Sequence, residues 1–233
     1  MQEEVKDQKK EKQSMPKGVL IGESIFDICY LIFDFAASVI FFSHGKDPVF
    51  FWYGWLTLIL GAGDAFHLVP RVIHHLFGNR GRVRWMMQLG ILVSSLSMTV
   101  FYLILVRIWF LLFDPTQISP SIILFIVMFA FMRLALCVFP QNKWFSGGNL
   151  KWSFARNIPF LFLGALVALL FVISGNTGDY GLWKMAVAIA VSFLCYFPVV
   201  IWAKQKPMVG VLMIPKTLAY VWMIAMGLSL LTI

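Results

Sequence analysis

The residues best suited to chemistry lie together in one apolar stretch of the chain, residues 60–75. It holds three of the four histidines, one aspartate and one arginine. Asp64, His67 and Arg71 follow one another at helical spacing, so one helix face would present a carboxylate, an imidazole and a guanidinium. Because an ionisable side chain inside a membrane is costly, it is read as functional by default. We therefore predict that Asp64 is a general base, or that it orients His67 as the base.

A second interior charge is predicted in the last apolar segment of the chain. Lys216 lies more than two turns inside this segment and directly follows Pro215, which removes a helical hydrogen bond close by. Lys216 completes the predicted catalytic set with Asp64 and His67. Either Lys216, Arg71 or a serine hydroxyl would stabilise the negative charge that develops on a substrate.

The first apolar segment is predicted to turn a polar face toward the interior of the protein. Its polar residues recur every three or four positions, and a stripe of acids cannot face lipid. This face, together with polar residues of later segments, provides the predicted substrate contacts. The predicted substrate-binding residues are Asp27, Tyr30, Asp34, Arg71, Ser95, Tyr102 and Tyr220.

A metal site is a further interpretation of residues 60–75. The candidate ligands are Asp64, His67, His74 and His75, and imidazole nitrogen suits zinc. One helix cannot supply a full tetrahedral ligand set, and neither an HxxxH nor an HExxH pair occurs. The cofactor is therefore left unassigned, with zinc possible but not favoured.

The elements that position these residues are predicted to be membrane-spanning helices. Of the 233 residues, 60% are apolar, and the mean hydropathy is +0.83, unlike a soluble domain. Apolar runs of about 20 residues, the length that crosses a bilayer, recur along the chain. We predict an all-α bundle of seven transmembrane helices. They lie near residues 18–43, 49–77, 85–113, 118–139, 153–174, 181–203 and 208–232.

The distribution of basic residues predicts the orientation of this bundle. Alternate connections carry nearly all of them, whereas the remaining connections hold only Lys46 and Lys184. By the positive-inside rule the N-terminus is cytoplasmic and the C-terminus lies outside, in a multi-pass protein of the cytoplasmic membrane. Residues 1–17 are expected to be a lysine-rich cytoplasmic tail without a cleavable signal peptide, and residues 18–233 a single transmembrane domain.

The net charge of +8 indicates a lipid partner. Because the basic residues lie in short connections between apolar segments, they suit anionic lipid headgroups and do not indicate nucleic acid. Arg107, Arg133 and Arg156 lie toward the ends of their segments, where an interfacial role is expected. The sequence does not specify the oligomeric state.

The pair Gly63-Asp64, followed by apolar residues and Pro70, resembles a motif of the YhhN-like lysoplasmalogenase family. Those small polytopic membrane enzymes cleave the vinyl-ether bond of lysoplasmalogens and resemble in outline the seven-helix hydrolases that include alkaline ceramidases. The resemblance covers about residues 50–105 and implies that Asp64 is the catalytic carboxylate. The family's second acidic motif has no counterpart in the last four predicted helices, so Asp34 or Lys216 would have to replace it.

These observations leave three classes of function open, and the sequence does not decide whether the chain is an enzyme. The leading hypothesis is a lipid-directed intramembrane hydrolase, which predicts one pocket lined by Asp64, His67 and Lys216. A proton-coupled transporter of a small solute is the alternative, since prolines interrupt several helices and interior acids can carry protons. A receptor-like or structural protein is the third, with its charges fully paired, for example in a clasp between Asp34 and Lys216.

Overall fold

A computed structural model describes residues 17–77, 81–145, 148–174, 181–203 and 205–232, which leaves the predicted tail at residues 1–16 outside the described part. Within those residues the fold is all-helical, which confirms the predicted fold class. The α-helices are α2 (Lys17–Ser43), α3 (Pro48–Phe77), α4 (Gly81–Leu112), α5 (Pro120–Val138), α6 (Leu150–Ser174), α7 (Trp183–Trp202) and α8 (Met213–Ser229). Short 3₁₀ helices are η1 (Pro115–Gln117), η2 (Pro140–Asn142), η3 (Pro207–Leu212) and η4 (Leu230–Thr232).

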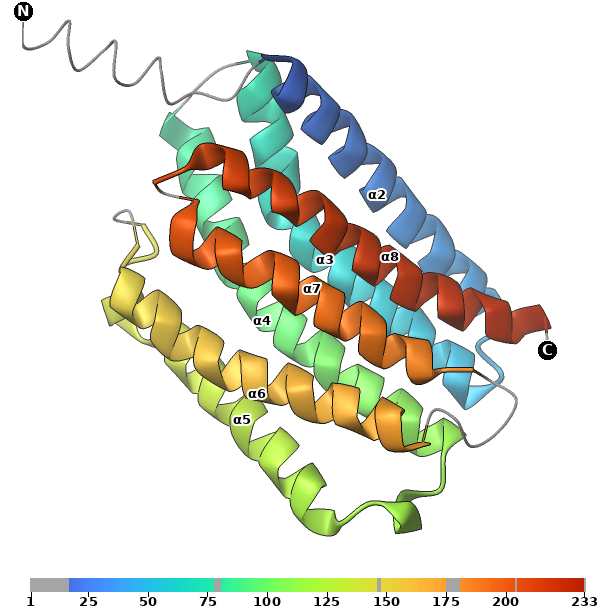
Figure 1. The fold of residues 1–233 in the computed structure, drawn as a ribbon. Helices are drawn as coiled ribbons and strands as arrows, with labels where there is room; N and C mark the ends of the chain where they lie inside the picture. Colours follow the sequence, from blue (N-terminus) through green and yellow to red (C-terminus); the bar gives the residue numbers. More distant parts are fainter. Residues whose placement is uncertain (1–16, 78–80, 146–147, 175–180, 204, 233) are drawn as a thin grey trace, which may run out of the picture.

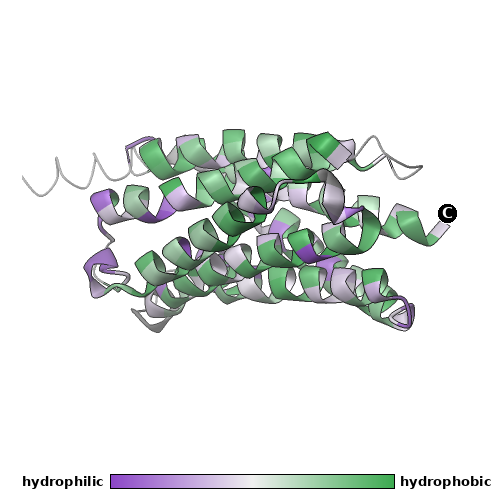
Figure 2. Ribbon diagram, turned by 90° about the horizontal axis from the view of Figure 1, so that it is seen from below, coloured by the Kyte–Doolittle hydropathy of each residue, from purple (hydrophilic) through white to green (hydrophobic). Residues whose placement is uncertain are grey.

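Seven helical segments in the described residues are long and apolar enough to cross a membrane, as predicted. Their bounds differ from the predicted ones by no more than four residues at either end. The last span joins η3, α8 and η4 into one segment, Met208–Thr232. Figure 2 shows apolar residues along the lengths of the helices and hydrophilic residues gathered mainly at the two ends of the bundle. The chain is therefore built as a polytopic membrane protein.

The helices run up and down, and each packs beside its neighbour in the sequence. The chain also closes on itself, because α8 contacts α2 and α3 as well as α7. Helix α5 lies at the periphery, against α6 and α4 (Figure 1). We call the end at which α2 begins the basic end, since the connections with most of the basic residues lie there. The chain's last described residues lie at the opposite end.

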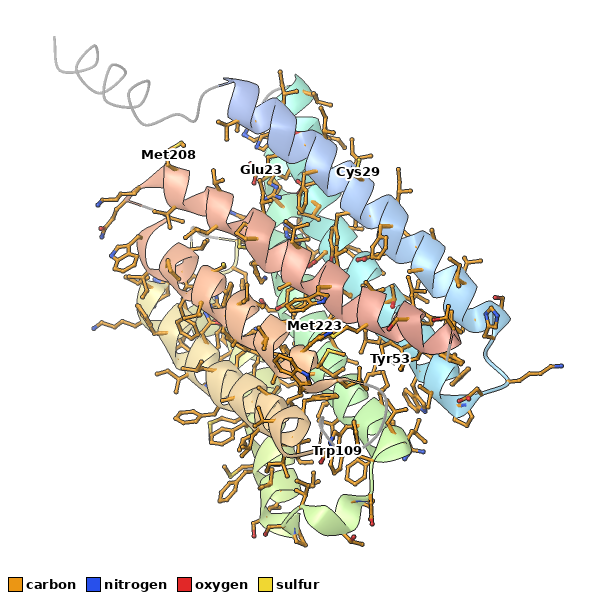
Figure 3. The ribbon with its side chains drawn as sticks, turned by 45° about the vertical axis from the view of Figure 1, so that its right-hand side comes forward. Glu23, Cys29, Tyr53, Trp109, Met208 and Met223 are labelled. Carbon is orange, nitrogen blue, oxygen red and sulfur yellow. The ribbon has the colours of Figure 1, made fainter. Side chains whose placement is uncertain are left out.

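Aromatic side chains fill the half of the bundle farther from the basic end. Tyr53 of α3 stacks on Phe41 of α2 with ring centroids 5.1 Å apart, and Trp109 of α4 is fully buried nearby. Figure 3 labels Tyr53 and Trp109 at this end of the bundle, with Met223 of α8 toward its middle. Large rings bury much apolar area and leave little free volume. Any sizeable cavity must therefore lie toward the basic end.

Helices α3 and α4 pack backbone against backbone at Gly90. Pro70 cannot donate a hydrogen bond to the carbonyl of Phe66, and Gly90 packs its backbone directly against that carbonyl. A Cβ atom at Gly90 would overlap the Phe66 carbonyl, whereas one at Gly22 of α2 would meet no atom within 4 Å. The absence of a side chain at Gly90 thus sets the distance between α3 and α4.

We expect Gly90→Ala to destabilise the bundle by about 1–3 kcal/mol, because the helices must separate to admit the methyl group. Gly22→Ala is the matched control and should leave the melting temperature unchanged or slightly higher, since alanine favours a helix. Thermal unfolding in detergent, followed by circular dichroism, measures both. Equal melting temperatures for the two variants would show that the contact at Gly90 does not limit the packing.

Candidate functional site

A cavity of about 340 Å³ lies inside the bundle, and each of the seven spans contributes to its lining. It extends from the middle of α3 toward the basic end. Small-molecule sites typically begin at about this volume. Predicted site residues that line it are Asp64, His67, Arg71, Ser95 and Lys216. The three residues predicted to be catalytic thus come from α3 and α8 to one cavity.

Asp64 is held by hydroxyl groups from two other helices. The Ser94 hydroxyl of α4 donates to Oδ1 at 2.6 Å, and the Tyr30 hydroxyl of α2 donates to Oδ2 at 3.0 Å. Each carboxylate oxygen keeps a further lone pair that can accept a hydrogen bond from water or substrate. The carboxylate is therefore fixed in orientation yet still able to accept a proton.

His67 lies one helical turn from Asp64 and lines the same cavity. Its Nδ1 atom is 3.9 Å from Asp64 Oδ1, too far for a hydrogen bond but within reach of a small rotation. Catalytic hydrogen bonds are often long until a substrate binds. The pair can therefore exchange a proton once the imidazole turns toward the carboxylate.

Arg71 is neutralised by two acids of α2. Its guanidinium donates to Asp27 at 2.7 and 2.8 Å, and its Nη1 lies 3.0 Å from Glu23 Oε1. The side chain of Glu23 is buried on the face of α2 that meets the bundle (Figure 3). Arg71 thus joins α3 to α2, and its charge is already balanced.

Lys216 of α8 also lines the cavity. Its Nζ atom is 4.7 Å from the Tyr196 ring centroid and 5.5 Å from that of Tyr220, both within cation–π range. Among the described residues no carboxylate forms an ion pair with Lys216. The suggested clasp with Asp34 is therefore not formed. Asp34 instead packs, fully buried, against Gly61 of α3.

Arg133 lines the cavity, although the sequence suggested an interfacial role for it. Its side chain is only 2% exposed, and its guanidinium lies 3.7 Å above the ring of Phe160. It donates to Thr99 Oγ1, to the Arg156 carbonyl and to Asn157 Oδ1, all at 3.0–3.1 Å. Its interior position depends on contacts with two other helices, α4 and α6.

Other residues missed by the sequence reasoning are Ser94, which holds Asp64, and Glu23, Tyr196 and Thr217 of the lining. Predicted substrate-binding residues outside the lining are Asp27, Tyr30, Asp34, Tyr102 and Tyr220. Tyr102 and Tyr220 are buried in the aromatic core, where each ring contacts Phe101 at about 5.5 Å. These two tyrosines lie farther from the basic end than the cavity and are not part of its lining.

The four candidate metal ligands do not converge. No group of three or more histidine, cysteine or acidic side chains in the described residues could hold a metal ion. His75 instead lies 3.2 Å from the hydroxyl of Ser24, and its ring neighbours that of His74. The chemistry available at the cavity is thus that of a carboxylate, an imidazole, hydroxyls and cations.

No protein-family model, curated protein or solved structure matches this chain. The resemblance to lysoplasmalogenases therefore rests on the Gly63-Asp64 motif alone. Any function assigned to this chain depends on the cavity and on the side chains that line it.

Proposed function

We propose that this protein is an intramembrane hydrolase that acts on a lipid-like substrate inside the cavity. The single observation that carries the proposal is that Asp64, His67 and Lys216 line one cavity. Hydrolysis needs a base for water and a positive group for the developing negative charge. Asp64 with His67 supplies the base, and Lys216 with Arg133 supplies the positive charge.

In the proposed reaction a water molecule donates a hydrogen bond to Asp64 and attacks the substrate. Asp64 takes the proton, directly or through His67, while the lysine and arginine stabilise the oxygen that gains charge. The proton then passes to the leaving group as its bond to the substrate breaks. For a vinyl ether, the linkage that the resemblance implies, the acid form of this pair first protonates the alkene carbon. Water then adds to the resulting oxocarbenium carbon and returns a proton to the pair, and the hemiacetal that forms breaks down to an aldehyde and the free alcohol.

The substrate is proposed to enter from the inner leaflet. The cavity lies in the half of the bundle nearer the basic end, and the positive-inside rule assigns that end to the cytoplasm. Basic connections at the same end would attract anionic headgroups to the opening. The proposed location is accordingly the cytoplasmic membrane.

The test is reconstitution of the full chain in liposomes that contain single-chain lipids with ester, ether or vinyl-ether linkages, in ¹⁸O-labelled water. A hydrolase should release a product that carries ¹⁸O, detected by mass spectrometry, from one linkage class. Liposomes that hold the heat-inactivated protein are the control. Absence of labelled product from every linkage class would refute hydrolysis of such lipids.

A proton-coupled transporter is the second candidate, and one observation favours it. Asp34 is fully buried against Gly61, which lies one helical turn from Asp64 on α3, so two carboxylates share one interior region. Such a pair can carry a proton across the middle of the bundle. A transporter predicts a proton flux in the same liposomes, seen with an entrapped pH dye and lost in Asp34→Asn, and no ¹⁸O-labelled product.

A further inference from the structure

Charged side chains reach the cavity from four helices. Glu23, Asp64 and Arg71 lie on α2 and α3, while Arg133 and Lys216 lie on α5 and α8. Glu23 pairs with Arg71, whereas Asp64 is oriented by two hydroxyls and keeps its charge. Arg133 and Lys216 form no ion pair among the described residues, although the Asp64 carboxylate acts on Lys216 across the cavity.

Arg133 is surrounded by uncharged oxygen atoms. Its three hydrogen bonds end on a hydroxyl, a backbone carbonyl and a side-chain amide, and no carboxylate of the described residues forms an ion pair with it. These partners orient the guanidinium without neutralising it. When the hydrogen-bond partners of a buried cation are all uncharged, binding of an anion beside that cation remains favourable.

Asn157 and Tyr196 connect Arg133 to Lys216. The oxygen of Asn157 accepts hydrogen bonds from both Arg133 Nη1, at 3.1 Å, and the Tyr196 hydroxyl, at 3.0 Å. The ring of that same tyrosine faces Lys216 Nζ at 4.7 Å. One scaffold therefore holds beside the same cavity two cations that form no ion pair with any described residue.

We propose that Arg133 and Lys216 form a binding subsite for a phosphate monoester carried by a single-chain lipid. A phosphate monoester has close to two negative charges at neutral pH and so balances both cations, whereas a carboxylate balances one. A guanidinium and an ammonium together are a common phosphate-binding pair. The inference deepens the proposed function by naming the substrate class, and it assigns these two cations to the headgroup rather than to the charge that develops at the bond being cleaved; the binding itself does not depend on hydrolysis.

The experiment compares binding of 1-oleoyl-glycerol-3-phosphate with that of neutral 1-oleoyl-glycerol to the purified full chain in detergent. We expect about 10- to 100-fold tighter binding of the phosphate lipid, the effect of charge-assisted hydrogen bonds. Lys216→Met should abolish this preference, and Lys216→Arg should keep most of it. Lys46→Met, at an exposed lysine in the turn between α2 and α3, is the matched control and should bind like the wild type.

Competition with inorganic phosphate distinguishes a site for free phosphate from a site for the phosphate headgroup of a lipid. Competition by millimolar phosphate would support the subsite and show that a free phosphate suffices, while preference for the phosphate lipid without competition would support a lipid headgroup. Equal binding of both lipids by the wild type, or an unchanged preference in a folded Lys216→Met, would overturn the proposal. Because binding is measured without turnover, a clear preference with no ¹⁸O-labelled product would reject the hydrolase and leave the subsite standing.

Discussion

Replacing Asp64 with asparagine should lower the turnover of the chain's lipid substrate by at least about 100-fold, since a positioned general base commonly contributes that much. The amide cannot accept the proton from water, and the negative charge that faces the cavity disappears. Lys216 and Arg133 remain, so substrate binding should be retained while kcat falls. The rate of ¹⁸O incorporation in liposomes measures the loss directly.

The fold should survive this change because both partners of Asp64 are hydroxyls. Ser94 can still donate to the amide oxygen, and the Tyr30 hydroxyl can rotate to accept from the amide nitrogen. Asp47→Asn is a matched control at the start of α3, where the exposed side chain accepts from the Val49 amide and asparagine caps equally well. Turnover at the wild-type rate in Asp64→Asn, or the same loss in Asp47→Asn, would remove Asp64 from the mechanism.

The sequence predicted much of the fold because bilayer length and apolarity constrain it strongly. Seven apolar runs could only be spans, and their observed ends differ from the predicted ones by a few residues. The meeting of Asp64, His67 and Lys216 also followed from the sequence, since none of them can face lipid and one interior is available. Their catalytic roles stay a prediction.

The arrangement of partners across helices could not be predicted in the same way. Spacing shows which face of a helix is polar but not which neighbouring helix that face meets or at what depth. Arg133 is interior because Thr99 and Asn157, on two other helices, happen to reach it. Asp34 lies outside the cavity lining because Gly61 lets α2 pack closely against α3 at that level. Such contacts depend on the rotation of each helix about its axis.

Replacing Arg71 with methionine should cost about 3–5 kcal/mol of stability, the usual effect of removing one partner from a buried ion pair. Glu23 and Asp27 would then lie close together in an apolar bundle with no cation between them. Asp27→Asn should cost less, because Arg71 keeps its contact with Glu23 at 3.0 Å. Unfolding in detergent mixtures with increasing dodecyl sulfate measures each free energy.

The triple variant Glu23→Gln, Asp27→Asn, Arg71→Met separates a charge effect from a packing effect. With all three charges removed, stability should return close to that of the wild type, because a buried ion pair contributes little once its desolvation is included. A triple variant as unstable as Arg71→Met would instead assign the loss to the packing of the arginine stem. Recovery of stability would assign the loss in Arg71→Met to the carboxylates of Glu23 and Asp27, which that variant leaves without a cation in the interior.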